Sequence, residues 1–384
     1  MNFKVDQREL SKSLNVVVKG IPNNTTNEVL SGILIKAAGS FVELESTDTQ
    51  YFTKVKLSAQ VEDDGSAVFP GRLFYDIIKS LDDGAVNIKT DEFKSYISCS
   101  NSIFSTSIMD AGDFPRFPEI RADRSVKIDA SQFSSLSKQV AKFVSKDDSS
   151  GVLTGVFFEI GDGKIRATAT DGFKLCSAER NLAENAMTDD FSIVVPVHFL
   201  NEIVGLGLEE GTIAIYENNT QVILELDNMI FINRKLEGNY PDYKEMLTHE
   251  DETTIVVEKT EFLAAVKRAA LLKSESAPMT IEVDSGNDFV QLSAANVAVG
   301  NVREVVRALN YGESLKVTVD MMYVLEGISV INDKKLAISL SALGKPIYIR
   351  GISENINPEP ENVIMKPENV FANGAVFSMM PLSL

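Results

Sequence analysis

Residues 29–35 read VLSGILI, and residues 152–158, which lie 123 positions later, read VLTGVFF. Downstream of the first stretch, STD at residues 46–48 returns as ATD at residues 169–171 with the same shift. Internal similarity at a fixed spacing decides the architecture of a chain. This spacing is too long for the unit of a solenoid and matches the length of a whole domain. The sequence therefore predicts tandem, similar domains.

Each repeat begins with a short strand that runs into an amphipathic helix. Apolar residues at helical spacing predict these first helices over residues 7–19, 131–146 and 260–273. Their equivalent apolar anchors are Leu10, Phe133 and Phe262, which are 123 and 129 residues apart. The agreement of the anchors extends the repeat to three copies.

A second strand and helix lie in the middle of each repeat. We predict the second helices over residues 71–81, 197–207 and 320–332, each followed by a turn and a further strand. The fold class is therefore α+β, with domains over residues 1–123, 124–250 and 251–384. The third repeat ends differently, because a polar stretch with three prolines, residues 353–373, precedes a last strand over 375–380. We predict a solvated loop there.

The composition is typical of a soluble globular protein, with 44% hydrophobic and 24% charged residues. The N-terminal residues are polar and no apolar run is long enough to span a bilayer, so neither a signal peptide nor a membrane segment is expected. Cys99 and Cys176 lack metal-ligand spacing, and we predict two reduced thiols within strands. This cysteine usage favours a cytoplasmic location.

The net charge of -18 argues against a nucleic-acid partner only if the charge is spread evenly. The three first helices carry +2, +3 and +2, which leaves -25 for the rest of the chain. Lysines on one helix face are usually only solubilising, but three equivalent basic helices in an acidic chain favour a phosphate backbone as partner. No base-reading motif accompanies them. The predicted binding is weak, independent of sequence and dependent on salt.

Residues that could carry catalysis are few. His198 and His249 lie in different local contexts, and no glycine spacing fits a phosphate-binding loop. Asp48 and Asp171 recur at equivalent positions, which favours a structural role in a turn. We therefore predict a protein that is not an enzyme, with no catalytic residues, no metal site and no cofactor.

Three motifs carry a family resemblance. Residues 169–175 (ATDGFKL), 238–243 (GNYPDY) and 380–384 (MPLSL) resemble the bacterial DNA polymerase III β subunit family, the sliding clamps, in order over the full length. The resemblance implies three tandem clamp domains, each with two helices packed on antiparallel sheet, and a head-to-tail homodimer that closes a ring of six domains. It also implies a non-catalytic processivity factor of chromosomal replication that encircles double-stranded DNA without sequence specificity and has no membrane partner.

The resemblance further implies that client proteins bind in an apolar pocket between the second and third domains. These clients are the catalytic subunit of DNA polymerase III, the clamp loader and other proteins with a clamp-binding motif. Carried over by position, the pocket consists of Leu153, Thr170, Gly172, Phe173, Lys174, Leu175, Pro241, Met246, Ser378, Met380, Pro381, Leu382 and Leu384. The set is mostly apolar, which suits varied client side chains. Core packing is the alternative for Leu153 and Leu175.

Two further surfaces follow from the resemblance. The DNA-facing residues are Arg8, Lys12, Lys19, Arg72, Lys138, Lys142, Lys146, Lys267, Arg268 and Lys273. The subunit contact pairs Ile77, Leu81 and Phe104 of one chain with Leu271 and Leu272 of the other. These apolar residues are equally compatible with an interior position.

The chain also departs from the family pattern. Phe173-Lys174 stands where His-Arg is usual, Ser383 replaces an arginine, and the loop over 353–373 is longer than the family's connection. These changes leave client preference open. An acidic, repeat-built interaction scaffold without DNA binding is the alternative function, and a hydrolase using Asp48 or Asp171 is a remote one.

Overall fold

The structure is a computed structural model. It describes residues 1–120, 123–207, 210–248, 253–272, 278–341, 344–353, 358–366, 370–371 and 374–382. The chain forms two compact units, each described by itself below. Unit 1 consists of Met1–Ser134, Ala183–Ile193 and His198–Lys235, and unit 2 of Ser135–Leu182, Val194–Val197 and Leu236–Leu384. The division passes through the second repeat of the sequence.

The predicted first helices are present in all three repeats. They are α1 (Gln7–Val17), α3 (Ala130–Val140) and α5 (Lys259–Ala269), and each continues into a short 3-10 turn: η1 (Val18–Gly20), η4 (Ala141–Phe143) and η7 (Ala270–Leu272). The carboxylate of Asp6 caps α1 by accepting from the backbone N–H groups of Arg8 and Glu9. Leu10, Phe133 and Phe262 are buried, which confirms them as the apolar anchors.

The second helices are also confirmed. They are α2 (Gly71–Ser80), α4 (Val197–Val204) and α6 (Met321–Val330), and a short α7 (Pro360–Val363) is additional. The remaining 3-10 segments are η2 (Glu28–Ser31), η3 (Ala111–Asp113), η5 (Asp148–Thr154) and η6 (Glu245–Thr248). Helix α4 ends before the predicted residue 207, because the chain turns there through Gly207, whose φ is +69°.

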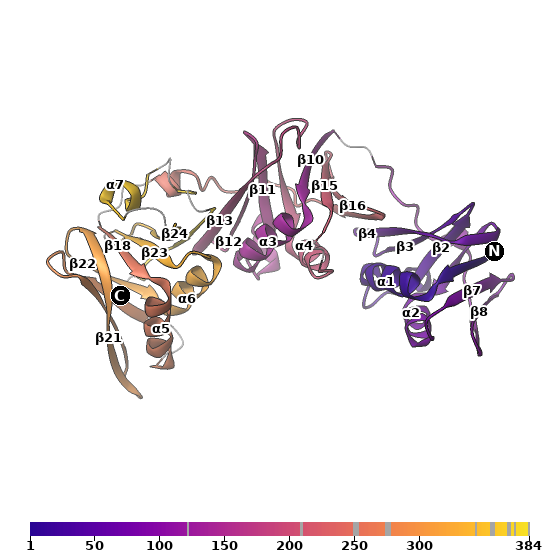
Figure 1. Cartoon of the computed structure of the whole chain (residues 1–384), viewed down its shortest axis with the longest axis horizontal. Helices are drawn as coiled ribbons and strands as arrows, with labels where there is room; N and C mark the ends of the chain where they lie inside the picture. Colours follow the sequence, from indigo (N-terminus) through magenta and orange to yellow (C-terminus); the bar gives the residue numbers. More distant parts are fainter. Residues whose placement is uncertain are drawn as a thin grey trace. The chain divides into compact units, whose positions relative to one another are not determined.

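Unit 1 contains two antiparallel sheets, and α1 packs beside α2 and against β3 and β4 (Figure 1). The five-stranded sheet has the order β5 (Gln60–Asp63), β1 (Asn2–Asp6), β7 (Ala85–Thr90), β8 (Lys94–Cys99), β9 (Ser102–Ser107). The eight-stranded sheet has the order β10 (Arg124–Asp129), β15 (Thr212–Glu217), β16 (Gln221–Leu226), β17 (Met229–Arg234), β4 (Phe52–Ser58), β3 (Phe41–Thr47), β2 (Gly32–Ala38), β6 (Gly65–Pro70). Because β17 pairs with β4, strands of the first and second repeats share one sheet.

Unit 2 carries a twelve-stranded sheet, and α5 packs beside α6 and against β20 and β21. Its order is β14 (Phe191–Pro196), β11 (Gly155–Gly161), β12 (Lys164–Thr170), β13 (Lys174–Asn181), β25 (Ala375–Met379), β24 (Ile347–Ile352), β23 (Lys335–Leu340), β18 (Thr253–Glu258), β21 (Gly300–Gly312), β20 (Phe289–Asn296), β19 (Pro278–Val283), β22 (Leu315–Asp320). The pairing of β13 with β25 joins the second repeat to the last strand of the chain.

Gly32 and Gly155, which are equivalent in the repeat, lie where no side chain fits. A Cβ on Gly32 would be 2.2 Å from Val68 Cγ1, and one on Gly155 would be 2.7 Å from the carbonyl oxygen of Val195. Each glycine is the first residue of a strand, β2 or β11, so the close approach explains why the repeat retains glycine there.

We therefore expect Gly32→Ala to lower the free energy of unfolding by about 1–3 kcal/mol, because the added methyl group overpacks the core. Gly112→Ala is the control, since a Cβ there meets nothing closer than 3.5 Å and its change should stay within about 0.5 kcal/mol. Urea unfolding followed by circular dichroism measures both. Equal stability of the two variants would contradict this packing account.

The segment over 353–373 is not a wholly solvated loop, and that prediction is wrong. Among its described residues, Val363, Met365 and Val370 are buried. Met365 and Val370 join an apolar cluster with Leu175 and Tyr348, while the guanidinium of Arg350 donates to the carbonyl oxygen of Val363. Apolar residues spaced among the polar ones anchor the segment on the sheet, because burying them gains free energy that a solvated loop lacks.

Cys99 and Cys176 are free, buried and located in β8 and β13, as predicted. Burial raises the pKa of the Cys176 thiol to about 12. Because both thiols are buried, they are suited to packing and not to reaction. Among the described residues, no helix combines the length and the apolar character needed to cross a membrane.

Candidate functional site

The turn between β12 and β13 in unit 2 presents Phe173 to solvent. The carboxylate of Asp171 accepts from the backbone N–H groups of Phe173 and Lys174, at 3.0 Å each. The hydroxyl of Thr170 donates to the carbonyl oxygen of Lys174, and Gly172 adopts a φ of +91°. Phe173, at the tip of this turn, is 67% exposed. This local network fixes the backbone and leaves the aromatic ring free.

The equivalent turn in the first repeat has the same construction. Asp48 accepts from the backbone N–H groups of Gln50 and Tyr51, and the hydroxyl of Thr47 donates to the carbonyl oxygen of Tyr51. Asp48 and Asp171 therefore hold turns together, as predicted from their recurrence.

The C-terminal tail, residues 380–382, lies beside the Phe173 turn. Strand β25 pairs with β13, with Lys174 opposite Met379 and Leu175 opposite Ser378. The backbone N–H of Met380 then donates to the carbonyl oxygen of Phe173 at 3.0 Å, and that of Leu382 donates to Thr318 on β22 at 2.8 Å. The tail is held at two points, although chain ends commonly fray.

Lys174 is enclosed by charged and aromatic groups from helix α6. Its ammonium group forms ion pairs with Glu326 and with Asp171, and lies 4.6 Å from the centre of the Tyr323 ring. Burial raises the pKa of Tyr323. The sequence analysis missed Tyr323 and Glu326, because no local pattern links α6 to a turn about 150 residues earlier in the chain. The one sequence feature that pointed to them was the predicted second helix of the third repeat, which contains both residues.

Several members of the predicted pocket form its inner wall and not its surface. Thr170, Leu175 and Ser378 are buried, and Leu175 packs with Tyr243, as expected for the core alternative. The accessible members that surround the turn and the tail are Gly172, Phe173, Lys174, Pro241, Met246, Met380, Pro381 and Leu382, called the tail surface here. Leu384 lies outside the described residues, as does Ser383.

Two members of the tail surface, Pro241 and Met246, come from the last residues of the second repeat. The hydroxyl of Tyr348 donates to the carbonyl oxygen of Met246, and Tyr348 lies opposite Ser378 in the sheet. The hydroxyl of Tyr240 donates to the carbonyl oxygen of Thr168 near the end of β12, which places Pro241 there. Leu153, at the end of η5, is half-buried.

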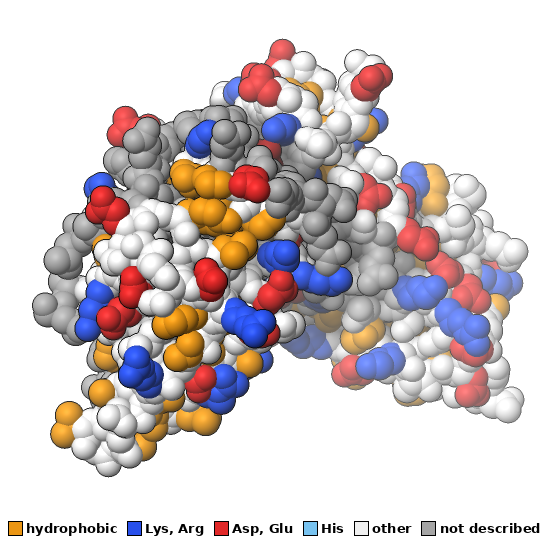
Figure 2. All heavy atoms as spheres, turned by 60° about the vertical axis from the view of Figure 1, so that its left-hand side comes forward, with side chains coloured by type: hydrophobic (Ala, Val, Ile, Leu, Met, Phe, Trp, Pro, Cys, Tyr) orange, Lys and Arg blue, Asp and Glu red, His pale blue; other side chains and the backbone are white. Residues whose placement is uncertain are grey.

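Figure 2 shows one face of the molecule, on which hydrophobic side chains form patches among Lys, Arg, Asp and Glu side chains. Such patches on a protein surface commonly mark sites of protein–protein interaction.

The predicted DNA-facing residues divide into paired and unpaired cations. In unit 1, Arg8 forms an ion pair with Asp83 that lowers the pKa of this carboxylate, Lys12 lies 3.5 Å from Glu9, and Lys19 lies 3.6 Å from Glu202. Arg72 donates to the side-chain oxygen of Asn23 at 2.9 Å. Counting charges along a helix therefore overstates the free positive charge.

In unit 2, Arg268 forms a two-bond ion pair with Glu304, and the ammonium group of Lys142 donates to Ser329. Burial lowers the pKa of Lys142. Lys138, Lys146 and Lys267 are exposed and have no ion pair with any residue that the structure describes. Lys273 lies outside the described part of the chain.

The predicted subunit-contact residues also divide. Ile77 and Leu81 belong to the core cluster of unit 1, because they lie on the inner face and at the end of α2. Phe104 on β9 is 37% exposed and Leu271 is 81% exposed, while Leu272 is half-buried. Among the described residues, no group of three or more side chains is arranged to hold a metal ion.

Antiparallel sheets backed by pairs of helices, repeated three times, define the class of DNA clamp proteins. Models of the N-terminal, central and C-terminal domains of the DNA polymerase III beta subunit match residues 1–118, 127–242 and 244–367. The chain belongs to the bacterial DNA polymerase III beta subunit family, the beta sliding clamps, and is a non-catalytic processivity factor of DNA polymerase III. The fold is the α+β three-domain clamp fold, and family membership implies DNA polymerase and DNA as partners.

A curated relative agrees with this membership, and two solved structures agree with the fold. The chain is 29% identical over 361 residues to the beta sliding clamp of Staphylococcus epidermidis strain RP62A, covering 91% of this chain and 95% of the relative. The DNA polymerase sliding clamp of Bacillus subtilis superposes with a TM-score of 0.88 at 24% identity, covering 100% of this chain and 99% of that one. A putative DNA polymerase III beta subunit from Eubacterium rectale has the same TM-score at 22% identity, with both chains fully covered.

Proposed function

We propose that two copies of this chain join head to tail into a closed ring that encircles double-stranded DNA and carries the polymerase along it. The observation that carries this proposal is a free sheet edge in the first repeat and another in the third. A head-to-tail contact that repeats and closes gives a ring, and a ring stays on DNA without holding it tightly.

The two edges have complementary features. Strand β9 is the last strand of its sheet, and residues 300–307 of β21 pair on one side only, with β20, among the described residues. Exposed apolar side chains accompany both edges: Ile103 and Phe104 on β9, and Val305 and Leu271 in the third repeat. Long unpaired edges with exposed apolar residues are aggregation sites unless a partner covers them. Pairing β9 with β21 of a second copy satisfies both edges.

The ring is built from three domains of each chain, over residues 1–123, 124–250 and 251–384. The regular positions of α1, α3 and α5 support this division, as do the ranges matched by the three domain models. Boundaries near residues 123 and 251 place one first helix at the start of every domain. Two such chains supply six domains.

The first helices face the DNA in this proposal. Lys138, Lys146 and Lys267 are exposed cations without an acidic partner among the described residues, and Arg8, Lys12, Lys19, Arg72, Lys142, Arg268 and Lys273 complete the proposed DNA-facing set. Phosphates of any sequence satisfy such cations. The remainder of the chain is acidic and repels DNA, which favours the hole over the outer surface.

We expect the double variant Lys138→Gln/Lys267→Gln to weaken binding to a 30-base-pair duplex and to reduce its salt dependence. Each lost phosphate contact lowers the slope of log K against log salt by about 0.9. Fluorescence anisotropy of labelled duplex, from about 20 to about 150 mM salt, measures the slope. Lys316→Gln is the matched control, since Lys316 is an exposed lysine of β22 outside the first helices. If the double variant and the Lys316→Gln control have the same slope, Lys138 and Lys267 do not contact DNA phosphates.

Client proteins bind at the tail surface in this proposal: the catalytic subunit of DNA polymerase III, the clamp loader and other proteins with a clamp-binding motif. Exposed Phe173, Met246 and Met380 supply adaptable apolar contacts, and the backbone bonds of the tail fix their positions. The buried Leu175, Thr170 and Ser378 support this surface from below, and Leu153, Ser383 and Leu384 flank it in the family pattern. A clamp with this role works in the cytoplasm, where bacterial chromosomes are replicated.

Phe173 and Lys174 give this surface its own chemistry. Where the family usually presents His-Arg, this chain presents a phenyl ring without hydrogen-bonding groups and a lysine whose charge is matched by Glu326 and Asp171. We infer that its clients place apolar groups against Phe173. We do not expect them to place acidic side chains at Lys174, because its charge is already matched.

A further inference from the structure

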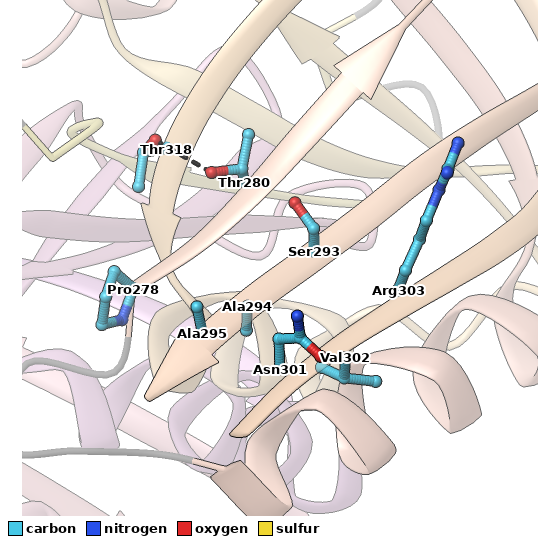
Figure 3. Close-up of a pocket in the computed structure, with 9 residues that line it drawn as sticks. All are labelled: Pro278, Thr280, Ser293, Ala294, Ala295, Asn301, Val302, Arg303 and Thr318. Atoms are coloured by element: carbon cyan, nitrogen blue, oxygen red, sulfur yellow. Dashed lines mark hydrogen bonds between the residues drawn. The ribbon is translucent and has the colours of Figure 1, made fainter. Parts of the chain in front are cut away.

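An open cavity of about 520 Å³ lies on the sheet of the third repeat, formed by β22, β19, β20 and β21 (Figure 3). Small side chains from Pro278, Ala295, Thr280 and Ser293 leave the space empty, and Arg303 lies at its side. None of the residues that line this cavity is acidic.

A polar row crosses the floor of the cavity. Thr318 lies opposite Thr280, Thr280 opposite Ser293, and Ser293 opposite Arg303, so the four side chains point to one face of four adjacent strands. The hydroxyls of Thr280 and Thr318 are 3.3 Å apart. Three hydroxyl groups thus lead to one guanidinium group; one hydroxyl of the Thr280–Thr318 pair donates to the other, and the hydroxyl of Ser293 lies next to Arg303 in the row.

No described residue neutralises the charge on Arg303 through an ion pair. Arg303 is exposed and has no ion pair with any described residue, whereas its neighbour Glu304, on the opposite face of β21, is held by Arg268. Glu282 lies in the next row of the sheet, opposite Lys316. A guanidinium group matches the geometry of a carboxylate and binds it through two hydrogen bonds. The chemistry of the cavity fits a carboxylate.

The cavity begins where the tail surface ends. The backbone N–H of Leu382 donates to the carbonyl oxygen of Thr318, the first residue of the polar row. Three strand spacings of about 4.8 Å separate Thr318 from Arg303, a distance of about 14 Å that four or five extended residues span. Pairing at the edge of β21 uses backbone groups, and Ser293, Thr280 and Thr318 lie on the successive strands β20, β19 and β22, away from that edge.

We propose that the cavity binds an acidic side chain of the client segment that flanks the apolar residues seated on the tail surface. This inference rests on the proposed binding of clients at the tail surface and adds a second, polar anchor to it. A client with a glutamate or aspartate at the right distance is bound more tightly than one with a neutral residue there.

The test uses pairs of fluorescein-labelled peptides that share a Leu-Phe core and a four-residue Gly-Ser spacer. One member of each pair carries Glu-Glu beyond the spacer and the other Gln-Gln, and the spacer is placed on either side of the core. At about 50 mM salt, the better-placed Glu-Glu peptide should bind the full-length chain about tenfold more tightly than its Gln-Gln partner. Arg303→Gln should abolish the difference, while Arg307→Gln, an exposed arginine four residues further along β21, should retain it.

Two results would overturn the inference and leave the tail surface intact. One is equal affinity of the Glu-Glu and Gln-Gln peptides for both placements of the spacer, and the other is a difference in affinity that persists in Arg303→Gln. A second measurement does not depend on the tail surface: titration of the acidic dipeptide Ac-Glu-Glu-NH2 should shift the Arg303 side-chain N–H signal in an arginine-labelled NMR sample. If the dipeptide shifts the Arg303 signal but neither long peptide binds, the tail surface is not a client site, and the cavity remains a carboxylate site. An unshifted Arg303 signal at saturating dipeptide would refute the cavity as a carboxylate site.

Discussion

The proposed ring predicts that the unaltered chain is a dimer at about 1 μM and that the variant Phe104→Asp is a monomer of 42.1 kDa. A carboxylate on β9 would be buried against apolar side chains of the second copy, without a partner for its charge. Losing an aromatic contact at an interface costs about 2 kcal/mol or more. Because a head-to-tail ring contains the contact twice, the dissociation constant should rise by about a thousandfold.

The variant Leu271→Asp should have the same effect from the other side of the contact, since Leu271 is among the most exposed leucines of the described chain. Ile120→Ser is the control, because Ile120 is an exposed aliphatic residue outside both edges. Sedimentation equilibrium measures all three masses. A dimer of unchanged affinity in both aspartate variants would show that these edges do not form the ring.

Removal of residues 382–384 should abolish binding of a peptide from the catalytic subunit of the organism's own DNA polymerase III. The deletion removes the backbone bond from Leu382 to Thr318 and frees the tail from β22. Phe173→Ala should weaken the affinity for the same peptide by about tenfold or more, because Phe173 is solvent-exposed and available to a client. Both proteins should remain dimers, since neither change touches β9 or β21.

Phe93→Ala is the matched control for Phe173→Ala. Phe93 is 68% exposed and belongs to unit 1, whereas the residues of the tail surface belong to unit 2. Its substitution should leave peptide affinity unchanged in the same anisotropy titration. If the deletion and Phe173→Ala bind the peptide as tightly as Phe93→Ala does, the tail surface is not where clients bind.

The sequence predicted the helices of this fold well because their signal is local. Leu10, Phe133 and Phe262 occupy equivalent helical positions, and each is buried. The sharing of sheets between repeats was not predictable, because β17–β4 and β13–β25 pairings join strands far apart in the chain. Local periodicity shows that a strand exists and does not identify its neighbour.

The candidate sites were predicted less completely, for two physical reasons. Apolar character does not distinguish a core residue from an interface residue, so Ile77 was grouped with Phe104 although only Phe104 is exposed. Charge counting does not reveal ion pairs between distant residues, so Arg8 was counted as a free cation although it pairs with Asp83. Both distinctions depend on tertiary structure.

The closed ring is tested most directly by retention on DNA after loading with the organism's own clamp loader and ATP. The account predicts that the protein stays on a nicked circular DNA for many minutes and leaves a linear DNA of the same sequence rapidly, because only a circle has no end to slide from. The predicted difference should persist at salt concentrations that abolish binding to a short duplex. Equal loss from the circle and the linear DNA would contradict the ring and favour an acidic scaffold without a DNA role.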